Sequence, residues 1–196
     1  MSKPTEISCL DIVLKKAKKN YCKGTIALNE NRDGASLTNV IVNGLHPEYL
    51  ALKPDKCGFQ IFSSGYGSKQ CDYILFSEFG GKKVAVFVEL KSSVPQDDAQ
   101  SKAPQLNVNG RYEDYVTQLT GSSCLLDFLN SVLINFCSCT NLSNYQRYYT
   151  VLHNTDIPII GELVPLTRPE SNTSPKQAYI RKTLNDEQIT LGQLIR

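Results

Sequence analysis

The chain has 196 residues, of which 41% are hydrophobic and 20% are charged. This length and composition suit a single globular domain over residues 1–196, with a core large enough to need no disulfide or metal crosslinks. The net charge of +2 is too small to indicate a polyanionic partner by itself, so any such partner must be inferred from local clusters of charge.

The opening residues, MSKPTEISCL, contain no apolar run of the length that a signal peptide needs. No apolar stretch of about 18 residues, the length of a membrane span, occurs in the sequence. We therefore expect a cytoplasmic protein with no membrane partner, whose seven cysteines are reduced thiols that pack as small apolar residues. In the alternative, Cys57, Cys71, Cys137 and Cys139 bind a metal, but their spacings match no usual zinc pattern.

Residues 5–20 are predicted to form an amphipathic helix, because apolar side chains recur there at helical spacing and Thr5 suits the N-terminal cap. The C-terminal end of this helix carries a cluster of lysines: Lys15, Lys16, Lys18 and Lys19. These lysines either form a solvated face that suits the negative end of the helix dipole or contact the phosphates of a nucleic acid.

Residues 24–43 are predicted to form short strands around the turn NENRDG, with NVIVNG as the clearest strand. Residues 45–55 are then expected to form a short helix. Pro47 suits the first turn of that helix, and Pro54 ends it.

The middle of the chain is predicted to form a sheet with a crossover helix. Glycines and serines separate three expected strands, at residues 58–62, 71–76 and 83–91. A long helix over 112–137 and a buried strand over 145–154 follow. A helix between two strands of one sheet is typical of a crossover connection.

The last segment, residues 154–196, is expected to close the domain as a hairpin with its turn at Asn185-Asp186. The chain is thus divided into an N-terminal helix and strands (1–43), a core (44–153) and this C-terminal hairpin. All three parts are expected to belong to one domain.

The strand pair around Gly80-Gly81 carries the charges that bear on function. If the two glycines form a two-residue turn, which their dipeptide favours, Asp72 faces Glu89 on the neighbouring strand. Directly opposed residues lie on one face with Cβ atoms about 4.5–5.5 Å apart. Lys91 shares this face because side chains alternate along a strand. The hairpin therefore gathers two carboxylates and an ammonium group at one end of an apolar face.

Two interpretations of this cluster follow from its chemistry. Opposed carboxylates repel each other unless one is protonated or a cation lies between them. Mg²⁺ or Mn²⁺ would suit such hard oxygen ligands. Alternatively, Glu89 and Lys91 form a structural ion pair on an edge strand, and a wider turn would also shift the register.

Asp72, followed after a β-hairpin by Glu89-Leu90-Lys91, resembles the motif of the PD-(D/E)xK nuclease superfamily, which includes restriction endonucleases and RecB-like nucleases. The resemblance covers residues 44–153. It implies an α/β (α+β) restriction endonuclease-like fold, with a mixed central sheet flanked by helices in α-β-β-β-α-β order. It also implies that Asp72, Glu89 and the backbone carbonyl of Leu90 ligate Mg²⁺, and that Lys91 acts on the attacking water and the transition state.

The same resemblance implies two further positions and shows two departures. Glu48 matches the acidic residue that many members carry on a preceding helix, although it also suits a solvated helix position. Gln118 matches the glutamine of RecB-like members, with Gln105 as its competitor, and would contact nucleic acid. Ser122 occupies the place of a tyrosine, and Cys71 replaces the proline that often precedes the first aspartate.

The function implied by the resemblance is hydrolysis of DNA phosphodiester bonds by a metal-dependent nuclease, an endonuclease of the restriction or defence type that uses Mg²⁺ or, in its place, Mn²⁺. RNA stays open as a substrate, and a homodimer would suit cleavage of both strands of a duplex. The alternative is a catalytically degenerate module with this fold that binds nucleic acid or a protein partner. Two histidines and the lack of a G-x-S-x-G motif argue against cysteine or serine catalysis.

Overall fold

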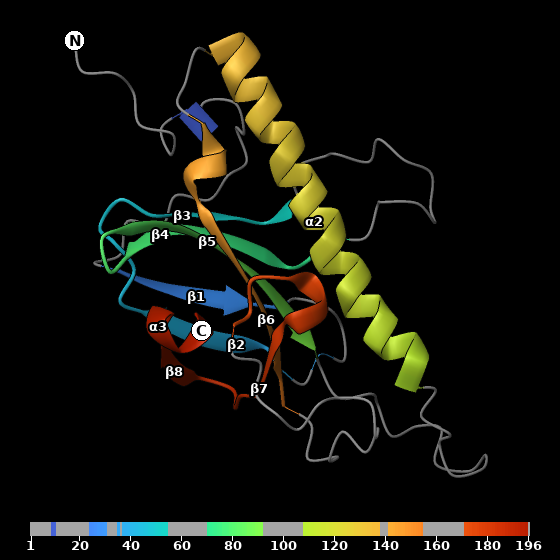
Figure 1. The fold of residues 1–196 in the computed structure, drawn as a ribbon. Helices are drawn as coiled ribbons and strands as arrows, with labels where there is room; N and C mark the ends of the chain where they lie inside the picture. The colour runs from blue at the N-terminus through green and yellow to red at the C-terminus, as the bar shows by residue number, and fades with distance from the viewer. Residues whose placement is uncertain are drawn as a thin grey trace, which may run out of the picture.

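The chain folds as a mixed α/β structure with two mixed β-sheets and few helices (Figure 1). The computed structural model describes residues 9–10, 24–30, 35, 37–54, 70–91, 108–137, 141–154 and 171–195. In the long helix α2 (Val108–Cys137), side chains are described from residue 115 to residue 136.

The larger sheet has five strands and contains the predicted hairpin. Its strands, in spatial order, are β3 (Leu50–Leu52), β4 (Tyr73–Phe79), β5 (Lys82–Lys91), β6 (Gln146–His153) and β7 (Tyr179–Lys182). The pairs β3–β4 and β4–β5 are antiparallel, whereas β5–β6 and β6–β7 are parallel. Helix α2 connects β5 to β6, so the predicted crossover between two parallel strands is confirmed.

The β4–β5 hairpin has the predicted register. Tyr73 pairs with Val88, and Phe79 pairs with Lys82, which leaves Gly80 and Gly81 as the turn. Their φ angles are +58° and +73°. A two-residue hairpin turn of the common primed type requires positive φ at both central positions, which glycine adopts without strain. The turn therefore fixes the pairing along the whole hairpin.

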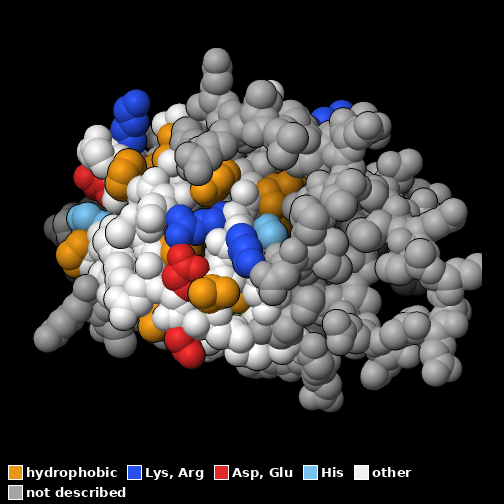
Figure 2. Space-filling view, turned by 90° about the horizontal axis from the view of Figure 1, so that it is seen from below, with side chains coloured by type: hydrophobic (Ala, Val, Ile, Leu, Met, Phe, Trp, Pro, Cys, Tyr) orange, Lys and Arg blue, Asp and Glu red, His pale blue; other side chains and the backbone are white. Residues whose placement is uncertain are grey.

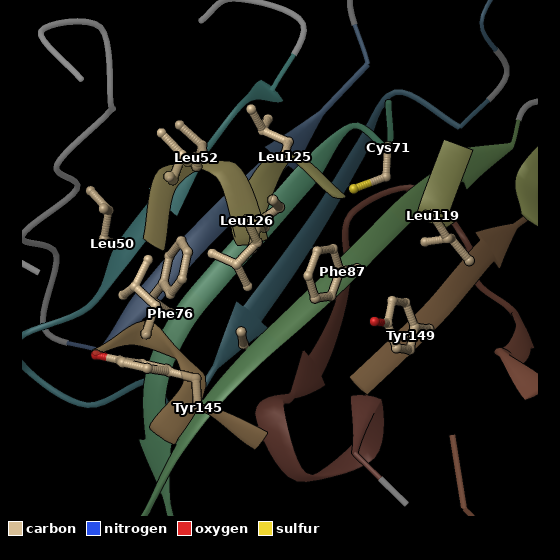
Figure 3. Packing of buried hydrophobic residues seen from close by; sticks show 14 of the residues in the cluster. Leu50, Leu52, Cys71, Phe76, Phe87, Leu119, Leu125, Leu126, Tyr145 and Tyr149 are labelled. Carbon is tan, nitrogen blue, oxygen red and sulfur yellow. The ribbon is translucent and has the colours of Figure 1, made fainter. Parts of the chain in front are cut away.

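Helix α2 covers one face of the five-stranded sheet, and leucines spaced along it form the core there (Figure 3). The fully buried members of this core include Leu119, Leu126, Leu129 and Leu133 from α2 and Ile74, Phe76 and Phe87 from the hairpin. Phe87 stacks on Tyr149 of β6 with ring centroids 4.8 Å apart. The helix continues through Gly121 without interruption.

The opposite face of the five-stranded sheet packs against the smaller sheet. That sheet consists of β1 (Thr25–Asn29), β2 (Asn39–Asn43) and β8 (Glu187–Thr190), with β1–β2 antiparallel and β2–β8 parallel. The strands predicted within residues 24–43 are thus confirmed. Burial on both faces explains why β4 and β5 are almost continuously apolar. Short helical segments occur at η3 (Leu142–Asn144), η4 (Pro175–Gln177) and α3 (Leu191–Leu194).

The helix predicted over residues 45–55 is wrong, because strand β3 lies there. Leu50 and Leu52 belong to the core beneath α2, whereas Ala51 belongs to the core beneath the smaller sheet. Only an extended chain directs successive side chains to opposite faces, so burial on two sides overrides the local preference. The strand expected at 58–62 and most of the helix expected at 5–20 lie outside the described residues.

The predicted C-terminal hairpin is wrong in its pairing. Strands β7 and β8 and the intervening turn exist, but β7 pairs with β6 and β8 pairs with β2, in different sheets. The N–H of Thr38 donates to the Asn185 side chain at 2.7 Å, and the N–H of Asp186 donates to the carbonyl of Asn39 at 2.9 Å. These contacts hold the turn against β2, so the C-terminal segment joins the two sheets.

The segment Tyr115–Phe136 of α2 is, by length and composition, long and apolar enough to cross a membrane, with a mean hydropathy of 1.2. Helices in the cores of soluble proteins can have the same length and apolar composition, and the leucines of α2 that face the sheet are fully buried. The prediction that no membrane takes part therefore stays a prediction.

Cysteine chemistry differs from the expectation at one position. Cys9 is disulfide-bonded, whereas Cys71 and Cys124 are free thiols. Cys9 is 3% exposed and belongs to the core beneath α2. A disulfide is therefore present, although the length and composition had indicated that the core needs none, while the cytoplasmic location stays a prediction.

We expect Asn172→Ala to lower the free energy of unfolding by about 2–3 kcal/mol, because buried hydrogen bonds are lost and a cavity is left. Asn172 is fully buried, and its amide donates to the carbonyls of Tyr149 at 3.0 Å and Leu194 at 2.8 Å. Chemical denaturation would measure the change. Thr173→Ala, at the exposed neighbouring position, should stay within about 0.5 kcal/mol of wild type, and equal losses would contradict this role of Asn172.

Candidate functional site

Asp72 and the Glu89-Leu90-Lys91 motif lie together where the β4–β5 hairpin opens. Asp72 immediately precedes β4, and the motif ends β5. The pairing of Tyr73 with Val88 places Asp72 opposite Glu89 in the same register. The N–H of Leu90 donates to Oδ2 of Asp72 at 2.7 Å. The Asp72 side chain therefore continues the contacts of the two strands past their last backbone pair.

Glu89 is a buried carboxylate that pairs with Lys91. Its side chain is 1% exposed, and Nζ of Lys91, whose side chain is 30% exposed, lies 2.8 Å from its Oε1. The same ammonium group donates to Oε1 of Gln118 on α2 at 2.6 Å. Burying a carboxylate is costly unless a cation compensates its charge, and Lys91 provides that compensation here.

The two positions at which the sequence departs from the nuclease pattern contact each other. The N–H of Cys71 donates to Oγ of Ser122 on α2 at 2.7 Å, and both residues are fully buried. A proline at position 71 would have no N–H to donate. Ser122 therefore accepts a hydrogen bond that exists only because residue 71 is a cysteine and not a proline. The sequence showed each departure, but no local pattern indicated that the two residues meet.

The thiol of Cys71 lies near both carboxylates. Burial is the largest cause that raises its pKa, a hydrogen bond with Ser122 lowers it, and the negative charges of Glu89 and then Asp72 raise it further. These causes agree with the strand register, which brings Asp72 and Glu89 close to each other. A thiol held in its neutral form is a poor nucleophile, which argues further against cysteine catalysis at this position.

The parallel strands bring two more residues to this end of the sheet. Lys91 pairs with His153 at the end of β6, and His153 pairs with Lys182 at the end of β7. Paired residues of a sheet point to the same face, so the three residues form a row on the side of α2. In the sequence, the available signal was that these strands end in VELK, VLH and YIRK.

Glu48 does not join the site. It lies in an exposed loop before β3, and the N–H of nearby His46 donates to Oγ of Ser77. Ser77 lies five positions after Asp72, roughly 17 Å along a strand. The prediction that Glu48 ligates the same metal is therefore wrong, because the expected helix that would have carried it is a loop and a strand.

Several other predicted contacts cannot be placed on this geometry. The four lysines of the N-terminal cluster and the competing glutamine lie outside the described residues: Lys15, Lys16, Lys18, Lys19 and Gln105. Of the residues expected to contact nucleic acid, Gln118 is described, and it is 7% exposed. Its amide oxygen accepts from Lys91, so it positions a candidate catalytic group.

The donor set fits a hard cation that also binds water. Asp72 and Glu89 offer carboxylate oxygens, and Leu90 offers a backbone carbonyl. Within the described residues, no three His, Cys, Asp or Glu side chains cluster. Mg²⁺ is usually bound through one or two carboxylates together with water and substrate phosphates, so it needs no such cluster. A cation at this site would compete with Lys91 for Glu89.

No protein-family model, curated protein or solved structure matches the chain. What the site can do must therefore be inferred from its own geometry. That geometry consists of two neighbouring carboxylates, a lysine paired with one of them, and two α2 side chains that contact the same strands.

We expect Ser122→Ala to lower the free energy of unfolding by about 1–3 kcal/mol, because the buried N–H of Cys71 loses its acceptor. In a Cys71→Pro background, which has no such N–H, the same substitution should cost less than half as much. Chemical denaturation of the two single variants and the double variant gives the coupling energy. Additive losses would contradict the complementarity of the two positions.

Unfolding should also depend on pH through His153. Burial, and then the charge of Lys182, lower its pKa from the ordinary 6.5. As pH falls, His153 therefore binds a proton in the unfolded chain before it does so in the folded protein. This contribution to the free energy of unfolding is fully present above about pH 6.5, and it is lost as pH falls towards the lower pKa of His153 in the folded protein.

We expect His153→Gln to flatten the dependence of the unfolding free energy on pH between about pH 7 and pH 5, measured by denaturant titration. His46→Gln, at the exposed second histidine, controls for the loss of an imidazole. If the slope stays as steep in His153→Gln as in wild type, other groups cause it.

Proposed function

We propose that this chain is a metal-dependent nuclease of the PD-(D/E)xK superfamily that hydrolyses DNA phosphodiester bonds, as an endonuclease of the restriction or defence type. One observation supports this above all. Asp72 and the Glu89-Leu90-Lys91 motif meet at one end of the β4–β5 hairpin, and Gln118 of the crossover helix contacts the lysine. Cleavage of both strands of a duplex would suit a homodimer.

We infer a restriction endonuclease-like core from the order and direction of the elements. Antiparallel β3, β4 and β5 precede α2, and α2 leads to β6, which runs parallel to β5. This succession of three strands, a helix and a strand is similar to the core that the resemblance implies. The smaller sheet adds a layer on the side away from α2.

The chemistry of the proposal needs few protein groups. A bound Mg²⁺ supplies an activated water and a positive charge beside the phosphoryl oxygen, and Mn²⁺ can take its place. Asp72, Glu89 and the carbonyl of Leu90 would hold the ion. Lys91 directs its ammonium group towards the same place, where it can donate to the attacking water or to a phosphate oxygen.

Gln118 has a positioning role in this proposal. Its Oε1 accepts from Nζ of Lys91 at 2.6 Å, and it is nearly buried. A long lysine side chain loses much rotational freedom when its ammonium group is held in this way. The glutamine therefore keeps the charge of Lys91 at the end of β5 even when Glu89 turns to a cation.

A second candidate function also has an observation in its favour. Glu89 is 1% exposed and is already paired with Lys91, as in a structural ion pair. In a module that binds nucleic acid or a protein partner without chemistry, this pair would hold β5 against α2 and no cation would enter. The two functions differ in whether a divalent cation can compensate the negative charge of Glu89 once Lys91 is removed.

We expect Lys91→Met to lower the free energy of unfolding by about 3 kcal/mol without divalent ions, because a buried carboxylate loses its partner. Under the nuclease proposal, millimolar Mg²⁺ or Mn²⁺ should restore part of that stability while cleavage falls by about 10²- to 10⁴-fold. Thermal denaturation with and without Mg²⁺ measures the first effect. Digestion of plasmid and of single-stranded DNA with Mg²⁺, Mn²⁺ or EDTA measures the second.

Carboxylate variants provide the matched controls. Asp72→Asn and Glu89→Gln should abolish cleavage while the protein stays folded, since each keeps the size of the side chain. Glu78→Gln removes an exposed carboxylate at the turn end of the same hairpin and should cleave like wild type. If wild type cleaves no DNA or RNA, and divalent ions do not stabilise Lys91→Met, the binding module is the better description.

A further inference from the structure

Asp72 lies just beyond the part of the hairpin that strand pairing fixes. The last backbone pair of β4 and β5 joins Tyr73 to Val88, so Asp72 is one position outside the ladder. The end of a strand opens at a lower free-energy cost than its middle. A carboxylate that ligates a metal must nevertheless be held within about half an ångström of its position. The position of Asp72 therefore calls for contacts in addition to the ladder.

Cys71, the residue before Asp72, supplies two such contacts. Its N–H donates to Oγ of Ser122 on α2 at 2.7 Å. Its thiol donates to the carbonyl of Tyr73, the residue after Asp72, at 3.1 Å. The first contact attaches the chain to the helix, and the second closes a short turn around Asp72. From β5, the N–H of Leu90 donates to Oδ2 of Asp72 at 2.7 Å.

Cys71 and Ser122 act on Asp72 from inside the molecule. Both are fully buried, whereas Asp72 is partly exposed. Figure 2 shows the molecule from below, and on that face lysine and arginine side chains gather beside a histidine and an acidic side chain. A ligand that approaches the surface of the protein meets side chains of this kind and does not touch Ser122. Any effect of Ser122 on a ligand must therefore pass through the position of Asp72.

We propose that Ser122 is a positioning residue for Asp72 and thereby sets the affinity of the candidate site for Mg²⁺ or Mn²⁺. The identity of this ion as the catalytic cofactor rests on the proposed nuclease function. Ser122 acts through the backbone of Cys71, whereas Gln118, one turn earlier on the same helix, accepts from Lys91 at 2.6 Å. The serine then affects the binding of the cation, and the glutamine affects the group that acts on the phosphodiester.

Calorimetric titration of the protein with Mn²⁺, without nucleic acid, tests the role of Ser122. We expect Ser122→Ala to raise the Kd for Mn²⁺ about tenfold, because contacts that orient metal ligands are typically worth about 10- to 100-fold in affinity. If circular dichroism shows that Ser122→Ala is unfolded, Ser122→Cys replaces it, since a thiol is a weaker acceptor of similar size. A Kd equal to that of wild type in the folded variant would overturn the proposal.

The matched control is Asn130→Ala. Asn130 lies eight positions after Ser122 on α2, about 12 Å further along the helix. Its Oδ1 accepts the N–H of the fully buried Leu142 at 2.7 Å, so this substitution also deprives a buried N–H of its acceptor. We expect a similar loss of stability but an unchanged Kd for Mn²⁺, because Asn130 has no contact with the strand ends at the site. Equal Kd values for Asn130→Ala and Ser122→Ala would overturn the proposal.

Cleavage at increasing Mn²⁺ provides a second readout if wild type is active. Ser122→Ala should regain most of the wild-type rate at saturating Mn²⁺, since its defect lies in the binding of the ion. Gln118→Met, which keeps the length of the side chain but not its oxygen, should stay slow at the same concentration. If saturating Mn²⁺ does not restore Ser122→Ala, the serine acts on the chemical step, and the assignment to metal affinity is wrong.

The titration also separates this proposal from the nuclease function. A wild type that binds no Mn²⁺ would refute both. If Asp72→Asn loses Mn²⁺ binding while Ser122→Ala binds as tightly as wild type, the role of Ser122 alone fails. If Ser122→Ala binds Mn²⁺ more weakly than wild type but wild type cleaves no DNA or RNA, the nuclease function is refuted and the positioning of Asp72 by Ser122 stands.

Discussion

The register of the β4–β5 hairpin is the constraint on which both the core and the site depend. A slip of one residue would turn Glu89 and Lys91 towards the smaller sheet and direct Val88 and Leu90 to α2. Both faces are apolar, so such a slip would bury two charges far from Gln118. The left-handed conformations of Gly80 and Gly81 exclude it, because they fix the turn from which the pairs are counted.

Lys91 connects the stability of this fold with its proposed chemistry. Its ammonium group compensates a carboxylate that is 1% exposed, and it is the same group that the nuclease proposal needs at the phosphate. A cation that binds Glu89 would release Lys91 from the ion pair, while Gln118 would keep it in place. Under the nuclease proposal, a bound metal would replace the contact that compensates Glu89 in the metal-free protein, so the charge of Glu89 would be compensated in both states.

Local patterns predicted the parts of this fold that local contacts determine. The hairpin, its register and the crossover helix follow from a Gly-Gly turn and from apolar periodicity within single segments. Strand β3 could not be predicted, because its burial depends on two layers that lie far apart in the sequence. The pairing of β7 with β6 and of β8 with β2 likewise depends on distant partners, and so do the row through His153 and the contact of Cys71 with Ser122.

The hydrogen bond between Cys71 and Ser122 also bears on the geometry of the candidate site. Gln118 and Ser122 lie one turn apart on α2 and therefore on one face of the helix. The first accepts from Lys91 on β5, and the second accepts from Cys71, the residue before Asp72. One helix thus positions both sides of the candidate site. The departures from the nuclease pattern keep this arrangement, since the serine accepts the N–H that the absence of proline makes available. Under the nuclease proposal this fixed separation between Asp72 and Lys91 matters, because the groups that act on a phosphodiester must be held close to the reactive geometry.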